Sequence, residues 1–555
     1  MTDLLVADLT PAGHWEGELS SSALSTAVAT IALKQIDLRS GGNSHAELTR
    51  GGMEWLARNV NADGGWGDTI RSRSNISTTA LCWAAFGACG ADKQFGSTVT
   101  RAESWLARAA GSIERLPHAI SERYGKDRTF SVPILMTLAI SGRLPAAAWR
   151  EIPALPFELA IFPRKLFGAL KLPVVSYALP ALIAIGQAIH HHAPSRNTVA
   201  RSLRNFSRAR TLKLLNELQP SNGGFLEATP LTAFVTMALA CAGNHEHPVA
   251  QKAATFLRAS VRPDGSWPID TNLATWVTTL SIKALSHQPG VLTSSQIDQL
   301  KDWLLAQQTT TIHPYTCAAP GAWAWSNLPG GVPDADDTAG ALIALHALGE
   351  PGARTIRAAE AGVTWLLDLA NRNGGLPTFC PGWGTLPFDR STPEITAHAL
   401  QAWARWRRYL NPRLQSRIDR ATSKALRFLQ SNQGPDGSFI PLWFGNEAAA
   451  AEANPVYGTA QVLIAFHELA GFGIAVPKNT LAGAANFLVA SQKNSGGWGG
   501  DKDSAESIEE TAIAIEALTG LPEYSANGRR GVERLLGLLE RGQWNEPAPI
   551  GLYFA

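Results

Sequence analysis

One short pattern recurs along the chain and constrains the fold more than any other feature of the sequence. In its clearest copy, an apolar stretch at residues 483–488 is followed by Gln492 and by a glycine turn that closes on Trp498. Other copies close on Trp66, Trp267 and Phe439, and partial copies close on Phe225, Leu376 and Trp544. A pattern that returns this often indicates an architecture of repeated structural units rather than a single irregular core.

Each copy is typical of a helix end followed by a tight turn. Apolar residues recur at helical spacing before the turn, and a glycine provides the positive φ angle that ends a helix. The closing aromatic residue can fold back on the helix, and a glutamine can hydrogen-bond free backbone groups at the helix end. A second stretch rich in Ala and Leu follows the turns, as at residues 77–88 and 511–518, so each unit is a helical hairpin.

These hairpins predict an all-α protein. Helical hairpins of this kind close into α/α toroids or stack as open solenoids. The pattern also accounts for part of an unusual composition, 18 Trp against 7 Tyr. We expect four of the tryptophans to be structural residues that close turns, namely Trp66, Trp267, Trp498 and Trp544.

Composition excludes several functional classes. The 555 residues include 48 Lys+Arg and 46 Asp+Glu, so no excess of positive charge favours a nucleic acid partner. With 45% hydrophobic and 17% charged residues the chain is globular rather than disordered. The 5 cysteines include no CxxC pair, which argues against a disulfide framework. The N-terminal segment MTDLLVADLT lacks the basic residues of a signal peptide, and we expect a cytoplasmic protein.

Residues 152–189 form a conspicuously apolar segment. Their longest uncharged run, residues 172–189, is borderline for a bilayer span, which needs about 20 apolar residues. Arg164, Lys165 and Lys171 precede the run, a layout that suits a segment lying in the interface of one leaflet. A buried core helix explains the composition equally well, and a spanning helix fits it less well.

Three aspartates within four residues, Asp334, Asp336 and Asp337, precede an apolar helical stretch at residues 340–348. A single aspartate at a helix start is an ordinary cap that the helix dipole favours. Three together favour holding a proton, because like charges raise one another's pKa, and a carboxylic acid that stays protonated can act as a general acid. The segment lacks the ligand ladder of an EF-hand, whereas its spacing is compatible with a magnesium-binding acidic box.

The Asp334-x-Asp336-Asp337-Thr338-Ala339 motif, together with the repeated Gly-Trp turns, resembles the class II terpene cyclases, and above all the squalene-hopene cyclases. The resemblance covers essentially the whole chain. The segment GHWEG at residues 13–17 is similar to the family's N-terminal Trp-Gly segment, and DRTF at residues 127–130 to its Arg-containing helix start. Residues 155–187 are similar to its membrane-dipping region, and EITAH at residues 394–398 to its Thr-Ala-His helix.

The resemblance implies a fold of two α/α-barrel domains built from helical hairpin repeats. We expect residues 1–20 to belong to the catalytic barrel and residues 21–271 to form an inserted α/α barrel. That inserted barrel would carry the membrane-contacting segment at about residues 152–189, and residues 272–555 would form the catalytic barrel with the acidic motif. A monotopic protein at the inner face of the cell membrane follows from the same resemblance.

By the same resemblance, Asp336 is the proton donor to a terminal carbon–carbon double bond of a polyprenyl substrate. Asp334 and Asp337 would maintain its acidity, and His398 would favour the anion that remains after proton transfer. A carboxylic acid is weak for protonating an alkene, so tuning by these neighbours is the essence of the catalysis. Taken without the family, His398 would be interpreted as a satisfied core histidine.

Carbocations that form along a folded polyene need a dry and electron-rich cavity. Each aromatic face stabilises a cation by about 0.5–2 kcal/mol. The resemblance places Trp325, Tyr177, Trp276 and Trp443 where the family keeps cavity aromatics, although each could equally be a core residue. The tryptophans therefore divide into turn residues and candidate cavity residues.

Departures from the family leave the substrate open. Several turns carry Val60, Val261 or Ala370 in place of glutamine, and Val277 stands where squalene cyclases usually have aspartate. The cavity could suit squalene, which the apolar segment favours, or farnesyl or geranylgeranyl diphosphate, or a prenylated aromatic. No cofactor is expected, except Mg²⁺ if the substrate is a diphosphate.

A diphosphate substrate would require fixed cations at one end of the cavity. The sequence offers Lys126, Arg128 and Arg390 for this role, although solvation or structural pairing explains any one of them as readily.

Two other classes compete with a terpene cyclase. A toroid of the protein prenyltransferase type would need a partner subunit and zinc held by Asp, Cys and His, and no cysteine here has such a ligand set. A non-catalytic α/α repeat scaffold leaves the three aspartates unexplained. We therefore expect an isomerase of terpenoid biosynthesis with a hydrophobic isoprenoid substrate, no metal site, peripheral membrane contact and the capacity to form a homodimer.

Overall fold

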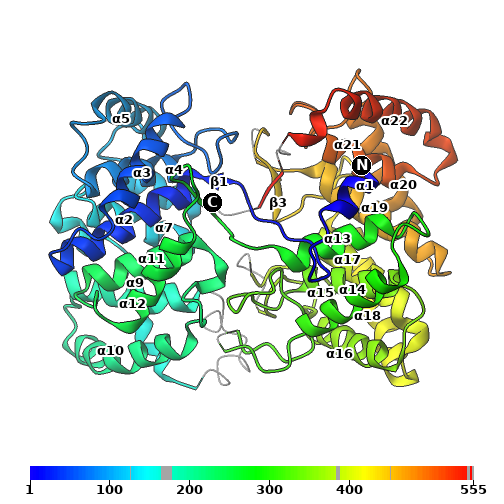
Figure 1. The fold of residues 1–555 in the computed structure, drawn as a ribbon, viewed down its shortest axis with the longest axis horizontal. Helices are drawn as coiled ribbons and strands as arrows, with labels where there is room; N and C mark the ends of the chain where they lie inside the picture. The colour runs from blue at the N-terminus through cyan, green and yellow to red at the C-terminus, as the bar shows by residue number, and fades with distance from the viewer. Residues whose placement is uncertain are drawn as a thin grey trace.

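The computed structural model describes residues 1–125, 127–163, 178–314, 316–382, 388–449 and 452–546, and the backbone of residues 550–552. The chain is almost entirely helical, and its helices form two bodies that lie side by side (Figure 1). We call them the first barrel, from α2 to α12, and the second barrel, from α13 to α22. The predicted all-α fold of two α/α barrels is confirmed.

The first barrel is a ring of inner helices surrounded by outer helices. The inner helices are α2 (Ala23–Ser40), α4 (Ile76–Ala88), α7 (Arg128–Ile140), α9 (Leu179–His192) and α11 (Thr229–Cys241). Each packs against the next, and α11 packs back against α2, so the ring is closed. The outer helices are α3 (Ala46–Arg58), α5 (Gly96–Ala110), α6 (Leu116–Tyr124), α10 (Thr198–Leu218) and α12 (Pro248–Ala259).

The second barrel repeats this arrangement. Its inner helices are α13 (Ala274–Leu285), α15 (Ala335–Ala347), α17 (Pro393–Trp406), α19 (Pro455–Gly471) and α21 (Ile508–Leu518). Its outer helices are α14 (Ser294–Gln307), α16 (Ala353–Leu369), α18 (Pro412–Asn432), α20 (Lys478–Ser491) and α22 (Ser525–Glu540). Each inner helix packs on the next, and an ion pair of 3.3 Å between Lys283 and Glu516 links α13 to α21. Inner helices such as α15 are buried on nearly every side, which explains why their sequences are apolar throughout.

Short strands and 3₁₀ helices complete the two barrels. Strand β1 (Ser21–Ser22) pairs antiparallel with β2 (Trp267–Pro268), and β3 (Phe444–Asn446) pairs antiparallel with β4 (Ile550–Leu552). The 3₁₀ helices are η1 (Ala146–Arg150), η2 (Phe157–Ile161), η3 (Phe225–Glu227), η4 (Arg407–Tyr409), η5 (Pro522–Tyr524) and η6 (Gln543–Asn545).

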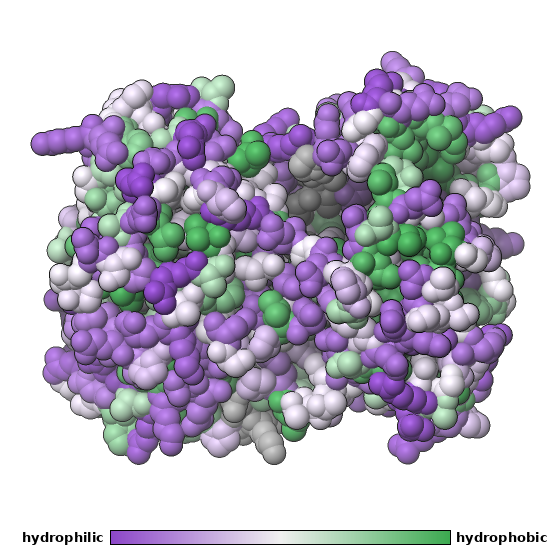
Figure 2. Space-filling model, viewed as in Figure 1, coloured by the Kyte–Doolittle hydropathy of each residue, from purple (hydrophilic) through white to green (hydrophobic). Residues whose placement is uncertain are grey.

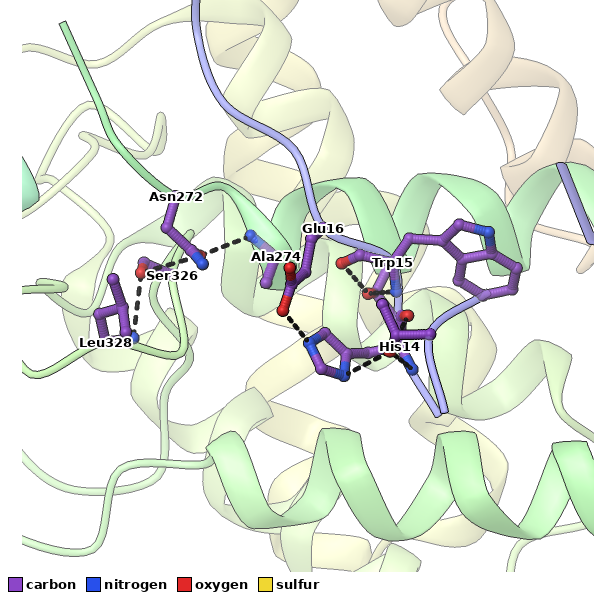
Figure 3. A network of polar contacts seen from close by, with 9 residues as sticks. His14, Trp15, Glu16, Asn272, Ala274, Ser326 and Leu328 are labelled. Carbon is purple, nitrogen blue, oxygen red and sulfur yellow. Dashed lines mark hydrogen bonds and ion pairs between the residues drawn. The ribbon is translucent and has the colours of Figure 1, made fainter. Parts of the chain in front are cut away.

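The N-terminal segment crosses from one barrel to the other. Helix α1 (Thr2–Ala7) lies against the second barrel, and the chain then runs to β1 beside the first (Figure 1). The backbone N–H of Trp15 donates to the hydroxyl of Thr278 on α13 at 3.0 Å, close to a hydrogen bond of 3.2 Å between His14 and Glu16 (Figure 3). The His14 ring also stacks on Trp303 of α14, with centroids 4.5 Å apart. Residues 14–16 are therefore anchored on the second barrel.

Two kinds of hydrogen bond hold the closing residue of the repeated turns in place. The indole N–H of Trp498 donates to the carbonyl of Leu488 at 2.7 Å, and Trp66 and Trp267 make the same bond to the residue ten positions earlier. The backbone N–H of Trp498 donates to the hydroxyl of Thr511 on α21 at 3.0 Å. We call this last contact the turn hydrogen bond. It is repeated in the pairs Trp66–Thr79, Phe225–Thr232, Trp267–Thr26, Trp323–Thr338, Leu376–Thr396 and Phe439–Thr459.

The glutamines bond backbone groups, as the sequence predicts, and they also join neighbouring repeats, which the sequence does not predict. The side-chain amide of Gln492 donates to the carbonyl of Gly496 in its own turn at 2.8 Å and to that of Asn527 on α22 at 2.9 Å. Gln219, Gln308 and Gln433 make equivalent pairs of bonds. Each glutamine therefore links its own turn to the N-terminal part of the next outer helix with one side chain.

Two tryptophans differ from the sequence prediction. Trp544 does not close a turn: it lies in η6 and is 43% exposed, since no further helix follows η6 in the described part of the chain. Trp323 is a turn residue that the sequence pattern misses, because its loop is longer than those of the other copies. It is fully buried, its indole donates to the carbonyl of Leu304, and Gln308 is the feature that could have revealed the repeat.

Part of the apolar segment at residues 152–189 belongs to the first barrel. From Ile183 to Ile189, helix α9 is buried among the inner helices, which matches the alternative of a core helix. Residues 164–177 lie outside the described residues. In the part of the chain that the structure describes, no helix is both long and apolar enough to cross a membrane.

The turns make a direct prediction about stability. Replacing Trp498 by alanine removes a fully buried indole and its hydrogen bond, and we expect a loss of about 3–5 kcal/mol in unfolding free energy. The measurement is the thermal unfolding midpoint of purified protein by circular dichroism. Trp544→Ala is the matched control and should change stability by no more than about 0.5 kcal/mol. Equal destabilisation by the two changes would contradict the assigned role of the turns.

Candidate active site

The acidic motif lies at the N-terminus of inner helix α15, where a repeat turn holds it. The backbone N–H of Asp334 donates to the carbonyl of Trp323 at 3.1 Å, and the N–H of Ala335 donates to that of Thr378 at 2.9 Å. Asp334 is the N-cap of α15, since its Oδ1 accepts from the backbone N–H of Asp337 at 2.8 Å. The predicted capping function is thus present, and it uses one aspartate of the three.

Asp334 and Asp337 are buried acids with raised pKa values. Burial is the main cause for both. The pKa of Asp334 rises to about 8, with a further increase from the charge of Asp336 and an opposing effect of the backbone N–H of Asp337. The pKa of Asp337 is raised well above its usual range, with additional contributions from the charges of Asp334 and Asp336. Both residues are therefore held largely in the neutral acid form near pH 7.

Asp336 contacts His398 directly. Oδ1 of Asp336 lies 2.7 Å from Nδ1 of His398, which comes from the middle of α17 on the neighbouring repeat. The two side chains are 20% and 23% exposed, whereas Asp334 and Asp337 are nearly inaccessible. The structure thus brings the four predicted catalytic side chains together and leaves the Asp336 carboxyl as the more accessible acid.

Glu394 is a fourth acid near the site that the sequence analysis misses. It is buried on α17 one turn before His398, and its Oε1 accepts from the backbone N–H of Leu442 at 2.9 Å. Burial raises its pKa to about 7, and the charge of Asp336 adds to the increase. Its position four residues before His398, on the same helix face, is the signal that could have identified it.

The site opens into a cavity of about 250 Å³ between the two barrels. Asp334, Asp336 and Asp337 line it from α15, and apolar side chains make up most of the remaining wall. The first barrel contributes residues of α2, α4, α7, α9 and α11, such as Leu24 and Phe234. A carboxyl group in such surroundings meets little water.

Three of the four predicted cavity aromatics line this cavity, namely Trp276, Trp325 and Trp443. Tyr177 lies outside the described residues. The structure adds Phe379, whose ring centroid lies 6.2 Å from Trp325 and 6.0 Å from Trp443 in edge-on geometry.

It also adds Phe444, whose ring stacks on Trp276 with centroids 6.2 Å apart and lies tilted against Tyr457 at 4.9 Å. The sequence pattern gives no sign of Phe379, which lies in a loop, or of Phe444, which lies in the short strand β3, because long-range packing brings both to the cavity.

The predicted phosphate-binding cations lie elsewhere. Arg128, at the start of α7, and Arg390 are both exposed, and neither lines the cavity, while Lys126 lies outside the described residues. The described part of the wall includes no Lys, Arg or His. Nor do the described residues contain a cluster of three or more His, Cys, Asp or Glu side chains arranged to hold a metal ion.

The raised pKa of Asp334 makes a prediction about pH. In the folded protein Asp334 holds a proton up to about pH 8, whereas its ordinary pKa is 3.8. Folding therefore takes up a proton between these values, and the stability that Asp334 contributes falls as the pH rises through this window, by up to about 1.4 kcal/mol per pH unit. Asparagine can still cap α15 but does not titrate. We expect the melting temperature of Asp334→Asn, relative to the unchanged protein, to rise from pH 5 to pH 8. A constant difference would contradict the assigned protonation.

Two family models match the sequence of this chain. The squalene-hopene cyclase C-terminal domain matches residues 273–551, and the N-terminal domain of the same family matches residues 1–178. Enfumafungin synthase of Hormonema carpetanum is 24% identical over 571 residues, covering 88% of this chain and 41% of that protein. Squalene–hopene cyclase of Alicyclobacillus acidocaldarius is 27% identical over 311 residues, covering 51% of this chain and 45% of that protein. The chain therefore spans less than half the length of these two curated relatives.

A solved structure shares the fold. That of ent-copalyl diphosphate synthase from Streptomyces platensis has a TM-score of 0.52 at 19% identity, with 97% of this chain and 91% of the other covered. Because the family model of the C-terminal domain alone matches half of the chain, and the N-terminal model matches most of the first barrel, the chain belongs to the squalene-hopene cyclase family.

Proposed function

We propose that the protein is a class II terpene cyclase, an isomerase that protonates a terminal double bond of a linear polyprenyl substrate and guides the carbocations to a polycyclic product. The observation that carries the proposal is the contact of 2.7 Å between Asp336 and His398 at the wall of a cavity lined by aromatic rings. Asp336 is the proton donor. Asp334 and Asp337 sustain its acidity, and Trp276, Trp325 and Trp443 stabilise cations.

The geometry suits proton transfer to an alkene. His398 holds Oδ1 of Asp336, so the proton leaves from the other carboxyl oxygen, and the Nδ1–H of His398 stabilises the anion that remains. The neutral acid forms of Asp334 and Asp337 add no fixed negative charge that would oppose this transfer. The reaction consumes no co-reactant, because a proton is added at one carbon and another is lost at the end.

Within this class we favour a squalene-like substrate. The described wall of the cavity has no cation for a diphosphate, and the chain is rich in apolar sequence near the cavity, at residues 178–189. The relatives named above include a squalene–hopene cyclase and enfumafungin synthase. The alternatives are a prenylated aromatic and a prenyl diphosphate, whose phosphate groups would need cations such as Lys126, Arg128 and Arg390.

The test is conversion of defined substrates by the purified protein. We expect a polycyclic product from squalene, detected by gas chromatography–mass spectrometry. Farnesyl diphosphate, geranylgeranyl diphosphate and a geranylgeranylated phenol should give no polycyclic product. Asp336→Asn should lower turnover by about 10²–10⁴-fold, the usual contribution of a general acid, without a change in melting temperature. Asp302→Asn, an exposed residue paired with Arg354, is the control and should keep full turnover. Turnover by Asp336→Asn equal to that of the control would refute the mechanism.

We also propose that the protein binds peripherally to the cytoplasmic membrane at its inner face. Val199, Leu203 and Phe206 are exposed and lie on one face of α10, at spacings of four and three residues. Phe162 and Ile312, also exposed, line a second cavity of about 1430 Å³ that α10 borders through Arg210. Exposed apolar side chains beside a large opening suit insertion into one leaflet.

A flotation assay with vesicles of anionic phospholipid tests this contact. We expect the unchanged protein to float with the vesicles and the double variant Val199→Glu, Phe206→Glu to remain in the aqueous fraction. The matched control carries Ile440→Glu and Phe472→Glu, two exposed apolar residues of the second barrel that do not line the second cavity, and should float normally. Flotation of all three proteins alike would place the membrane contact elsewhere.

Formation of a homodimer stays a prediction. Hydrophobic residues gather on one face of the second barrel, over α13, α21 and α22 (Figure 2). Leu280, Val532 and Leu536 are the exposed large residues there, and we propose this face for self-association.

A further inference from the structure

Asp270 lies outside the acidic motif, and it also lines the cavity. Asp270 lies between β2 and α13, on the segment where the chain passes from the first barrel to the second. It is 93% buried, lines the same cavity as Asp336, and its Oδ1 has no hydrogen-bond partner within the described residues. In the mechanism described so far this buried acid has no role, and an unpaired buried carboxyl is costly for the fold.

Glu227 lies close to Asp270 and is fixed by strong hydrogen bonds. Its neighbour Ala228 forms a β-bridge with Asp270. Both carboxyl oxygens of Glu227 accept from the amide of Asn222, at 2.9 and 2.8 Å, and Oε1 also accepts from the backbone N–H of Gly330 at 2.6 Å. A β-carbon at Gly330 would lie 2.5 Å from this oxygen, so the contact requires glycine.

The backbone at Glu227 is strained in a way that supports a function. Leu226 and Glu227 have φ angles of 61° and 55°, in the left-handed region that residues other than glycine rarely adopt. Such strain persists where the surrounding contacts maintain it, and it gathers at functional sites. Here the strained backbone holds the carboxyl group of Glu227 near the segment that carries Asp270.

The surroundings of Asp270 are dry. Leu226, Ala228, Ile269 and Leu273, its neighbours in the chain or across the β-bridge, all line the cavity with apolar side chains. A water molecule in a protein interior needs two to four polar partners, and these four neighbours of Asp270 supply no polar side chain. A carbocation that reaches this end meets a carboxylate before it meets an ordered water.

We propose that Asp270 is the base that ends the cyclisation by removing a proton directly from the final carbocation. This inference rests on the proposed function. A carboxylate oxygen of Asp270 takes a proton from a carbon next to the cationic centre, and the electron pair of that C–H bond becomes the new double bond. Asp270 ends protonated and Asp336 ends as the carboxylate, so the substrate has gained one proton and lost one. Exchange of both groups with solvent restores the starting state.

The environment suits a base of this kind. Burial and, next, the charge of Glu227 raise the pKa of Asp270 to about 7, which places its basicity close to the working range. Burial likewise raises the pKa of Glu227, while Asn222 and Gly330 favour its anion. Glu227 does not line the cavity and is a positioning residue that acts through Asp270.

Product analysis of Asp270→Asn tests the proposal, with a squalene-like substrate that the unchanged protein converts. We expect the variant to keep consuming substrate, because Asp336 still starts the reaction, while the share of the normal product falls by about 10-fold or more in favour of other alkenes or alcohols. Glu447→Gln is the control: it removes a carboxyl group between the barrels, bonded to Thr69, that does not line the cavity. It should leave the product distribution unchanged.

A measurement on the unchanged protein keeps the test independent of folding. In water enriched in ¹⁸O, direct deprotonation gives a product without ¹⁸O, whereas capture of water gives an alcohol that carries the label. An unlabelled alkene together with an altered product spectrum for Asp270→Asn would support the proposal. A labelled alcohol, or a normal product spectrum from a folded Asp270→Asn protein, would overturn it. Absence of any conversion by the unchanged protein would instead refute the proposed function.

Discussion

The turn hydrogen bond, from the backbone of a closing residue to a threonine on an inner helix, is the interaction on which the rest of the structure depends. It sets where each inner helix begins relative to its neighbours, and the active site uses two copies of it. Trp323 donates to Thr338, which lies two residues after Asp336. Leu376 donates to Thr396, which lies two residues before His398. Side chains that are 62 positions apart therefore meet at 2.7 Å because two equivalent repeats place their helices in register.

Burial, not the helix dipole, decides the protonation of the acidic motif. The N-terminus of α15 favours a carboxylate by about 0.3–1 kcal/mol, or up to about 2 kcal/mol where the geometry is good. Removing a carboxylate from water costs several kcal/mol. The pKa values of Asp334 and Asp337 are accordingly raised despite their position in the first turn. Burial thus holds two of the three acids, Asp334 and Asp337, in the neutral form.

The sequence predicted the repeats well and the site in part. Gln492 and Trp498 revealed the helical hairpins, because their contacts join groups close in the chain. The pairing of Asp336 with His398 came only from family resemblance. Nothing local in the sequence indicates that two helices will face each other.

Other features depend on packing that no local pattern encodes. Phe379, Phe444 and Asp270 line the cavity from short connecting segments between the helices, and long-range packing brings these segments there. The prediction for Trp544 was wrong for a similar reason. The sequence before Trp544 matches the repeat pattern in part, but the described chain offers no further helix for this side chain to pack on.

The charge pattern of the cavity wall suits the proposed carbocation chemistry. The described wall carries no positive side chain, so a carbocation would meet aromatic rings, aliphatic side chains, hydroxyl groups and acids along its path. In the proposed mechanism its strongest attraction is to a carboxylate, and the first carboxylate formed is that of Asp336, so return of the proton is the competing reaction. In the proposed mechanism, the hydrogen bond between His398 and Asp336 stabilises the carboxylate that remains and so discourages the return. Oδ1 of Asp270 has no hydrogen-bond partner in the described residues, so no such bond stabilises its anion there. We propose that this difference in hydrogen bonding between the two acids gives the cascade its direction.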